Sequence, residues 1–139
     1  MTRREFMTLL GIAPVRPVVA HAQAERVRLV GIIMTQAAGD PEGEARIAAF
    51  RQELQQLGWT DHHNIRLHTR WTAGNADNTR KSVAELLALA PDVILATGTS
   101  TVAPLIQESR TVPIVFVQVV DPVGAGFADN LARPGANAT

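Results

Sequence analysis

Three short polar stretches, each directly after an apolar run, hold the residues best suited to bind a small polar molecule. Hydroxyl and amide groups both donate and accept hydrogen bonds, and a carboxylate accepts them, so together they suit a small solute with polar groups. The candidate ligand-binding residues are Thr35, Gln36, Gly98, Thr99, Ser100, Thr101, Gln118 and Asp121.

The stretch Thr97–Thr101 places three consecutive hydroxyl residues at the predicted start of a helix. A helix start has unpaired backbone N–H groups and the positive end of the helix dipole, which favours a carboxylate or another anion. Pro104 predicts the helix cap near Ser100 or Thr101, because proline is tolerated where its missing N–H would be unpaired. In the alternative interpretation, one hydroxyl caps the helix and the others are solvated.

The stretch "PIVFVQVVDPVG", residues 113–124, runs from a buried-strand pattern into an acid followed by proline. A turn fully explains Asp121–Pro122, and a residue before proline is expected to be extended. An ordinary turn leading to a helix cap explains Thr35 and Gln36 equally well. For both stretches, only the position directly after a predicted strand indicates a binding role.

Other chemistry finds little support in the sequence. The chain has no cysteine, which excludes disulfides, thiolate catalysis and metal sites with sulfur ligands. His62 and His63 are adjacent and lack partners at metal-ligand spacing, so we predict a solvated turn and no metal. Phosphate-loop, dinucleotide and nucleophile-elbow motifs are absent, so we expect no cofactor. Trp59 and Trp71 are predicted to pack in or beside the core.

The hydrophobic period switches repeatedly between strand and helix, which is typical of an α/β fold with a parallel sheet. Residues 64–71 alternate apolar and polar side chains, which indicates an edge strand. We therefore predict a three-layer fold with sheet order 2-1-3-4 and right-handed crossovers. The predicted strands are residues 28–34, 64–71, 92–96 and 114–117, and the predicted helices start at Asp40–Pro41 and near Ala76, ending at Gly58 and Leu89.

Ligands of such folds lie beyond the carboxyl ends of the strands. The polar stretches all follow strands, so we expect them to meet at one edge of the sheet. Thirteen basic residues offset thirteen acidic ones, which gives no electrostatic argument for a nucleic-acid partner.

The first 22 residues resemble a signal peptide. Arg3 and Arg4 precede a short apolar run, and Ala20–His21–Ala22 offers a cleavage site. The run "TRREFM" is similar to the twin-arginine export motif, which predicts a periplasmic location. The alternative is a disordered basic N-terminus or a poor membrane anchor.

Several segments resemble the ABC transporter substrate-binding proteins of the group that includes tryptophan- and tyrosine-binding members. The resemblance implies the type I periplasmic-binding fold, with two lobes that close on a small solute and deliver it to a membrane permease. It also implies a monomer at full length, with Thr99, Ser100 and Thr101 at the ligand carboxylate. Asp121, Thr35 and Gln36 match other strand-end positions. The segments are "RREFMTLLG", "FRQELQQLGW", "NIRL", "RWTAGNAD", "PDVILATGT" and "TVPIVFVQVVDPVGAGFADNLARPGANAT".

Under this resemblance, residues 23–139 are an incomplete N-terminal lobe without its fifth strand or the second lobe. A site with one wall cannot enclose a ligand, so we expect very weak binding or none. Two alternatives remain at this point. One is an α/β enzyme lobe using Asp121 and the anion site at Thr99–Thr101, and the other is a ligand-sensing domain of a signalling protein.

Overall fold

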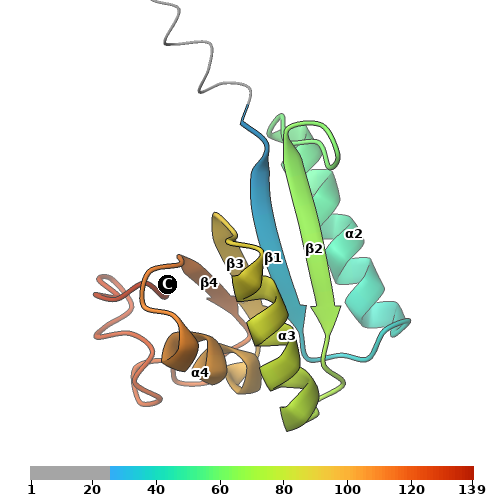
Figure 1. Cartoon of the computed structure of the whole chain (residues 1–139). Helices are drawn as coiled ribbons and strands as arrows, with labels where there is room; N and C mark the ends of the chain where they lie inside the picture. The colour runs from blue at the N-terminus through green and yellow to red at the C-terminus, as the bar shows by residue number, and fades with distance from the viewer. Residues whose placement is uncertain (1–25) are drawn as a thin grey trace, which may run out of the picture.

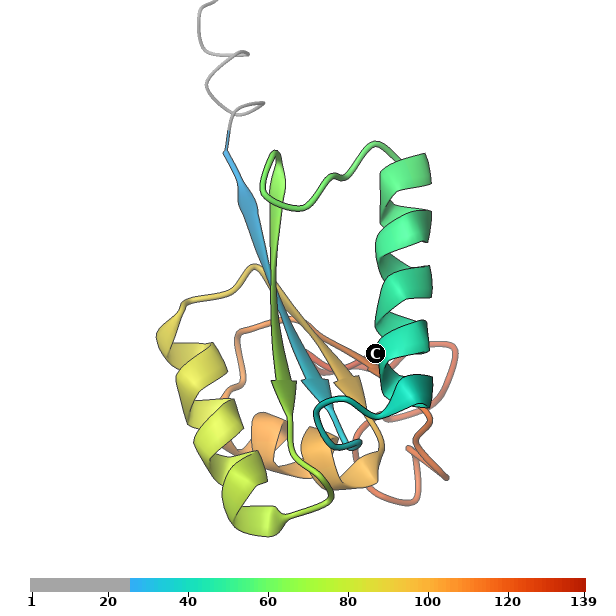
Figure 2. The same ribbon diagram turned by 90° about the vertical axis from the view of Figure 1, so that its right-hand side faces the viewer.

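The computed structural model describes residues 26–139, and it has three layers. Figure 2 shows the sheet edge-on, with helices packed on both of its faces. The predicted signal peptide, residues 1–22, lies outside the described residues. No helix in residues 26–139 combines the length and the apolar character needed to cross a membrane.

Four parallel strands form the sheet, and the predicted order 2-1-3-4 is confirmed. The amphipathic strand lies at one edge, as its alternating pattern predicts (Figure 1). The two strands with nearly continuous apolar sequence lie at the centre, and most of their side chains are buried or half-buried on both faces. The strands are β1 (Arg28–Met34), β2 (Ile65–Trp71), β3 (Val93–Thr97) and β4 (Ile114–Val117).

Three helices connect these strands and lie on both faces of the sheet (Figure 2). Asp40 accepts a hydrogen bond from the Gly43 N–H at 2.8 Å, and Pro41 follows as the first helical residue, so the predicted helix start is confirmed. α2 covers one face, and α3 and α4 cover the other (Figures 1 and 2). The helices are α2 (Pro41–Gln56), α3 (Ala76–Ala88) and α4 (Thr99–Glu108).

Alternate residues of β1 point to opposite faces and join two apolar clusters. Ile33 packs with residues of α3 and α4, whereas Ile32 and Met34 pack with residues of α2. Val115 and Val117 of β4 remain 39% and 41% exposed. The cluster with α3 and α4 contains more buried residues than the cluster with α2, so it is the larger core. The exposed valines show that β4 is incompletely covered.

The boundary between β3 and α4 differs from the prediction. β3 continues to Thr97, which pairs with Val117, and α4 begins at Thr99 with Gly98 as its N-cap. The predicted cap near Ser100 or Thr101 is wrong, because the Thr101 hydroxyl donates to the Thr97 and Gly98 carbonyls at 2.8 and 3.0 Å. Pro104 consequently lies inside the helix.

The last residues of the chain continue the sheet beyond β4. The Ile114 N–H donates to the Asn137 carbonyl at 2.7 Å, and the Thr139 N–H donates to the Ile114 carbonyl at 2.8 Å. This pairing is parallel, like the rest of the sheet. Within residues 26–139 this contact is an isolated bridge between Ile114 and Ala138, and the sheet has four strands.

Gly43 lets α2 approach β2 closely, and we expect its replacement by valine to separate the two elements. A Cβ atom at Gly43 would lie 2.7 Å from Trp71 Cζ3 and 3.2 Å from Gln36 Cβ. Such overpacking costs roughly 1–3 kcal/mol. Urea denaturation and Trp71 fluorescence, recorded with Trp59 replaced by phenylalanine, measure the effect. Ala45→Val, on an exposed position of the same helix, is the control, and equal losses in the two variants would contradict this account.

Candidate functional site

The three polar stretches meet at the carboxyl edge of the sheet, as the parallel order requires. The Thr35 N–H donates to Thr97 Oγ1 at 3.2 Å, which joins the ends of β1 and β3. The Gly98 N–H donates to the Val117 carbonyl at 2.9 Å, which joins the loop after β3 to the end of β4. Thr35, Gly98 and Gln118 are therefore neighbours in space.

Thr72 extends the same edge to β2, although nothing in its sequence context singled it out. Its side chain is fully buried, and its N–H and hydroxyl both donate to the Met34 carbonyl, at 2.9 and 3.1 Å. The next residue, Ala73, donates its N–H to the Gln36 carbonyl at 3.1 Å. These bonds hold the loop that carries Thr35 and Gln36.

The loop between β3 and α4 depends on Gly98. Its φ of 78° and ψ of 153° lie in a region that is essentially restricted to glycine. A Cβ atom there would lie 3.0 Å from Thr35 Cγ2. Within the described residues no side chain caps α4, and Thr99 and Ser100 are exposed in its first turn. Thr101 is fully buried and supports the loop from inside.

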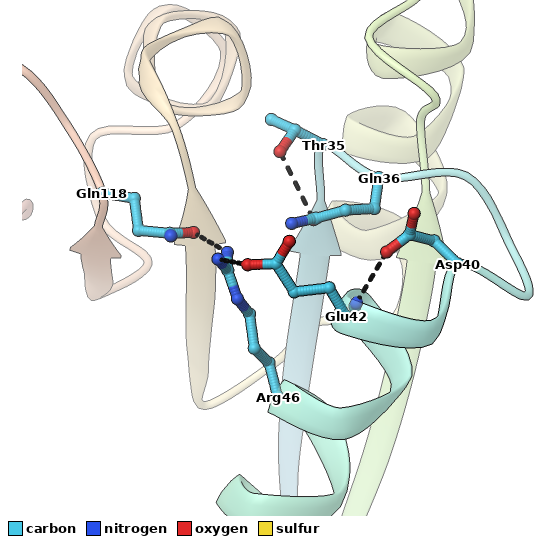
Figure 3. Close-up of polar contacts among 7 residues, drawn as sticks. Thr35, Gln36, Asp40, Glu42, Arg46 and Gln118 are labelled. Carbon is cyan, nitrogen blue, oxygen red and sulfur yellow. Dashed lines mark hydrogen bonds and ion pairs between the residues drawn. The ribbon is translucent and has the colours of Figure 1, made fainter.

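Thr35 and Gln36 are half-buried and contact each other. The Thr35 hydroxyl donates to Gln36 Oε1 at 3.4 Å (Figure 3). The Asp40 carboxylate is engaged at the start of α2, where Oδ1 accepts the Gly43 N–H (Figure 3). The first loop thus presents one hydroxyl and one amide at the edge.

Asp121 is not extended as expected for a residue before proline, since its φ is 47°. Its Oδ1 accepts a hydrogen bond from the Gly124 N–H at 2.9 Å, and its carbonyl accepts one from the Ala125 N–H at 2.9 Å. Aspartate tolerates this left-handed conformation when its side chain bonds the following backbone. Asp121 is exposed and holds its own turn through Oδ1.

No sequence pattern pointed to Arg46, and an acid such as Glu42 is ordinary in the first turn of a helix. Arg46 donates through Nη1 to Gln118 Oε1 at 2.5 Å, and its Nη2 forms an ion pair with Glu42 (Figure 3). The spacing of four residues signals the ion pair. Gln118 lies 72 residues away, so no local pattern indicates the second contact.

Two cavities of about 420 Å³ each lie at the site, on opposite faces of the sheet. Gln118 and Arg46 line an apolar cavity between α2 and the sheet, whereas Ser100 lines a cavity between α3 and α4. The candidate residues therefore share an edge and not a single cavity. The other residues of the apolar cavity are Met34, Ile47, Phe50, Leu95, Thr97, Val115 and Val117.

Residues 26–139 contain no group of three histidines, aspartates or glutamates that could hold an ion. His62 and His63 are exposed in the turn before β2. Trp71 packs in the α2 cluster, whereas Trp59 remains 39% exposed beside it, in agreement with the predicted packing roles.

Comparisons with known proteins give one family. Residues 32–139 match the model described as ABC transporter substrate binding protein. A tyrosine-binding protein of Clostridioides difficile (strain R20291) is 26% identical over 88 residues, which are 63% of this chain and 26% of that protein.

Three solved structures share the fold. A ligand-free, open substrate-binding protein with adhesive properties from Clostridium difficile has a TM-score of 0.72 at 26% identity, over 81% of this chain and 38% of that one. A conserved domain protein from Vibrio cholerae has a TM-score of 0.73 at 27% identity, over 82% and 38%. An ABC domain in complex with L-Trp, from Streptococcus pneumonia, has a TM-score of 0.71 at 19% identity, over 81% and 37%. This chain thus spans well under half the length of each relative.

Proposed function

Because this chain belongs to the ABC transporter substrate-binding protein family, we propose that it forms one wall of a receptor for a small organic solute. Members of this family are binding proteins and not enzymes, which excludes the enzyme-lobe alternative. The family also implies a location outside the cytoplasm. In our proposal the receptor captures its solute in the periplasm and delivers it to a membrane permease.

The observation that supports this function is the meeting of hydroxyl, amide and backbone N–H groups at the carboxyl edge. Open α/β sheets bind their ligands at this edge. The bonds from Thr35 to Thr97 and from Gly98 to Val117 bring the loops together without using the exposed hydroxyls of Thr99 and Ser100. The edge therefore offers donors that are available to a ligand.

Each candidate residue has a proposed role. Thr99 and Ser100, with the uncapped start of α4, bind a carboxylate, because the backbone N–H groups and the helix dipole favour negative charge there. Thr101 and Gly98 hold this loop in shape. Gln36 and Gln118 contact acceptor oxygens of the solute, including those of its carboxylate, and Thr35 and Asp121 contact its remaining polar groups.

The proposed ligand class is an amino acid. The relatives include a tyrosine-binding protein and a domain that was solved with L-Trp. The apolar cavity beside Gln118 provides an environment for an apolar side chain. We further propose that residues 1–22 direct export, by the twin-arginine route, and that the full-length protein is a monomer.

We expect the 139-residue chain to bind L-tryptophan or L-tyrosine only at millimolar concentrations. One wall cannot enclose the ligand, so most of the ligand surface stays in water. Titration followed by ¹⁵N–¹H NMR should shift the backbone signals of Gly98, Thr99 and Ser100, with Gln107 at the other end of α4 as an internal control.

Two results would contradict the proposal in different ways. Unchanged signals at the carboxyl edge with every amino acid tested would remove the binding function. Micromolar or tighter affinity by calorimetry would instead show that a single wall suffices.

A further inference from the structure

Arg46 makes a long-range connection at the carboxyl edge. It is a residue of α2, and its guanidinium donates to the side chain of Gln118, directly after β4 (Figure 3). Glu42, one turn earlier in α2, pairs with the same guanidinium and holds it over the edge. Within residues 26–139, this is the one side-chain hydrogen bond between α2 and the segment after β4.

The chemistry of this bond fixes the orientation of the Gln118 amide. A guanidinium has five N–H donors and no acceptor. Gln118 must therefore turn Oε1 toward Arg46, so its NH₂ group points elsewhere. No described residue accepts a hydrogen bond from this NH₂ group. Gln118 thus keeps two free donors at the edge.

The backbone of Gln118 is also held in an unusual conformation. Its φ of 57° is left-handed, which is uncommon for a residue other than glycine, asparagine or aspartate. The preceding carbonyl, that of Val117, accepts the Gly98 N–H at 2.9 Å, so the strand end is anchored. Such conformations persist where the surroundings impose them, and they concentrate at functional sites.

Gln36 shows the same arrangement on the neighbouring loop. Its Oε1 accepts the Thr35 hydroxyl at 3.4 Å, which leaves its NH₂ group as a donor (Figure 3). Two primary amides at the edge therefore have their oxygens occupied and their nitrogens free. Donors select a ligand that presents acceptor oxygens.

We propose that Arg46 is a positioning residue that orients the Gln118 amide, so that its NH₂ group selects solutes bearing a carboxylate or another acceptor oxygen. The inference rests on the proposed binding function, and it adds a residue and a selectivity to it. Arg46 itself stays paired with Glu42 and Gln118 and does not contact the solute.

The test compares variants of the 139-residue chain by NMR, with L-tryptophan and tryptamine as probes. Tryptamine keeps the ring and the amine but lacks the carboxylate. In the wild type, L-tryptophan should bind at least about tenfold more tightly than tryptamine, since a hydrogen bond to a charged group contributes about 1.5 kcal/mol or more. Arg46→Met should move the Gln118 NH₂ signals toward those of a free amide and weaken L-tryptophan binding by about tenfold.

Three further variants separate positioning from general damage. Arg46→Lys keeps a donor and should retain part of the effect. Gln118→Glu keeps an acceptor for Arg46 but loses the NH₂ group, so it should bind L-tryptophan about tenfold more weakly. Arg51→Met, on the same helix at a residue that faces Asp61, is the control and should bind like the wild type.

Several results would overturn the inference. They are unchanged Gln118 NH₂ signals in Arg46→Met, equal binding of tryptamine and L-tryptophan, or full binding by Gln118→Glu. If neither probe binds the wild type, the proposed function and the selectivity both fail. The NH₂ signals of Arg46→Met still decide the positioning role in that case, because they are measured without a ligand.

Discussion

Replacing Gly98 by valine is expected to lower the free energy of unfolding by about 1–3 kcal/mol and to disrupt the carboxyl edge. The φ and ψ of Gly98 lie in a glycine-only region, and a Cβ atom would lie 3.0 Å from Thr35 Cγ2. The loop must therefore move, and Thr99 and Ser100 move with it. Urea denaturation measures the loss of stability, and the NMR signals of Thr35 and Ser100 report the displacement.

Gly58→Val is the matched control for this prediction. Gly58 also has a positive φ, 89°, but it follows α2 and has no atom within 4 Å of its Cβ position. It should lose stability through backbone strain alone, without moving the signals of Thr35. If the two variants disturb the edge equally, the contact between Gly98 and Thr35 has no special role.

Replacing Leu86 by alanine is expected to cost about 2–5 kcal/mol of unfolding free energy. Leu86 is fully buried in the larger core cluster, where α3 packs on the sheet. A Cβ atom added at Gly31 of β1 would lie 3.3 Å from Leu86 Cδ2, so the leucine fills the space above that glycine. The free energy of unfolding of a domain of this size is about 5–15 kcal/mol in total, so the expected loss is a large share of it.

Leu131→Ala removes the same atoms from a side chain that is 75% exposed. It should change the free energy of unfolding by about 0.5 kcal/mol or less. Urea denaturation of both variants provides the comparison. A loss below about 1 kcal/mol in Leu86→Ala would show that α3 is loosely packed, in conflict with its complete burial.

The Gly98→Val and Leu86→Ala predictions concern two connected parts of the molecule. The packed core supports the sheet, and the sheet positions the polar loops at its carboxyl edge. α3 and α4 bury one face of the sheet, and the loops at the carboxyl edge are fixed by bonds such as Thr72 to Met34 and Thr35 to Thr97. β4 is less well covered, since Val115 and Val117 are more than one-third exposed. We therefore expect the loop that carries Gln118 to be the least stable part of the edge.

Sequence patterns determined the elements and their order. A strand covered on both faces must be apolar throughout, and a strand at the edge alternates, so β1 and β2 were assigned to their places without any structure. Helix ends that depend on neighbouring residues were also predictable. Asp40 caps the start of α2 by accepting the N–H of Gly43, three residues later, and Gly58 has a positive φ just after the end of the same helix. The same order brings the polar stretches to one edge.

The folded structure decided the details of the site that sequence patterns left open. The cap of α4 moved to Gly98 because the Thr101 hydroxyl bonds the backbone of the preceding strand end. Asp121 became left-handed because its carboxylate bonds Gly124, against the local preference before proline. Arg46 meets Gln118 across 72 residues. The Thr101 and Asp121 bonds span three or four residues and compete with other local bonds that the sequence pattern allows equally. The contact between Arg46 and Gln118 depends instead on where packing brings distant segments of the chain.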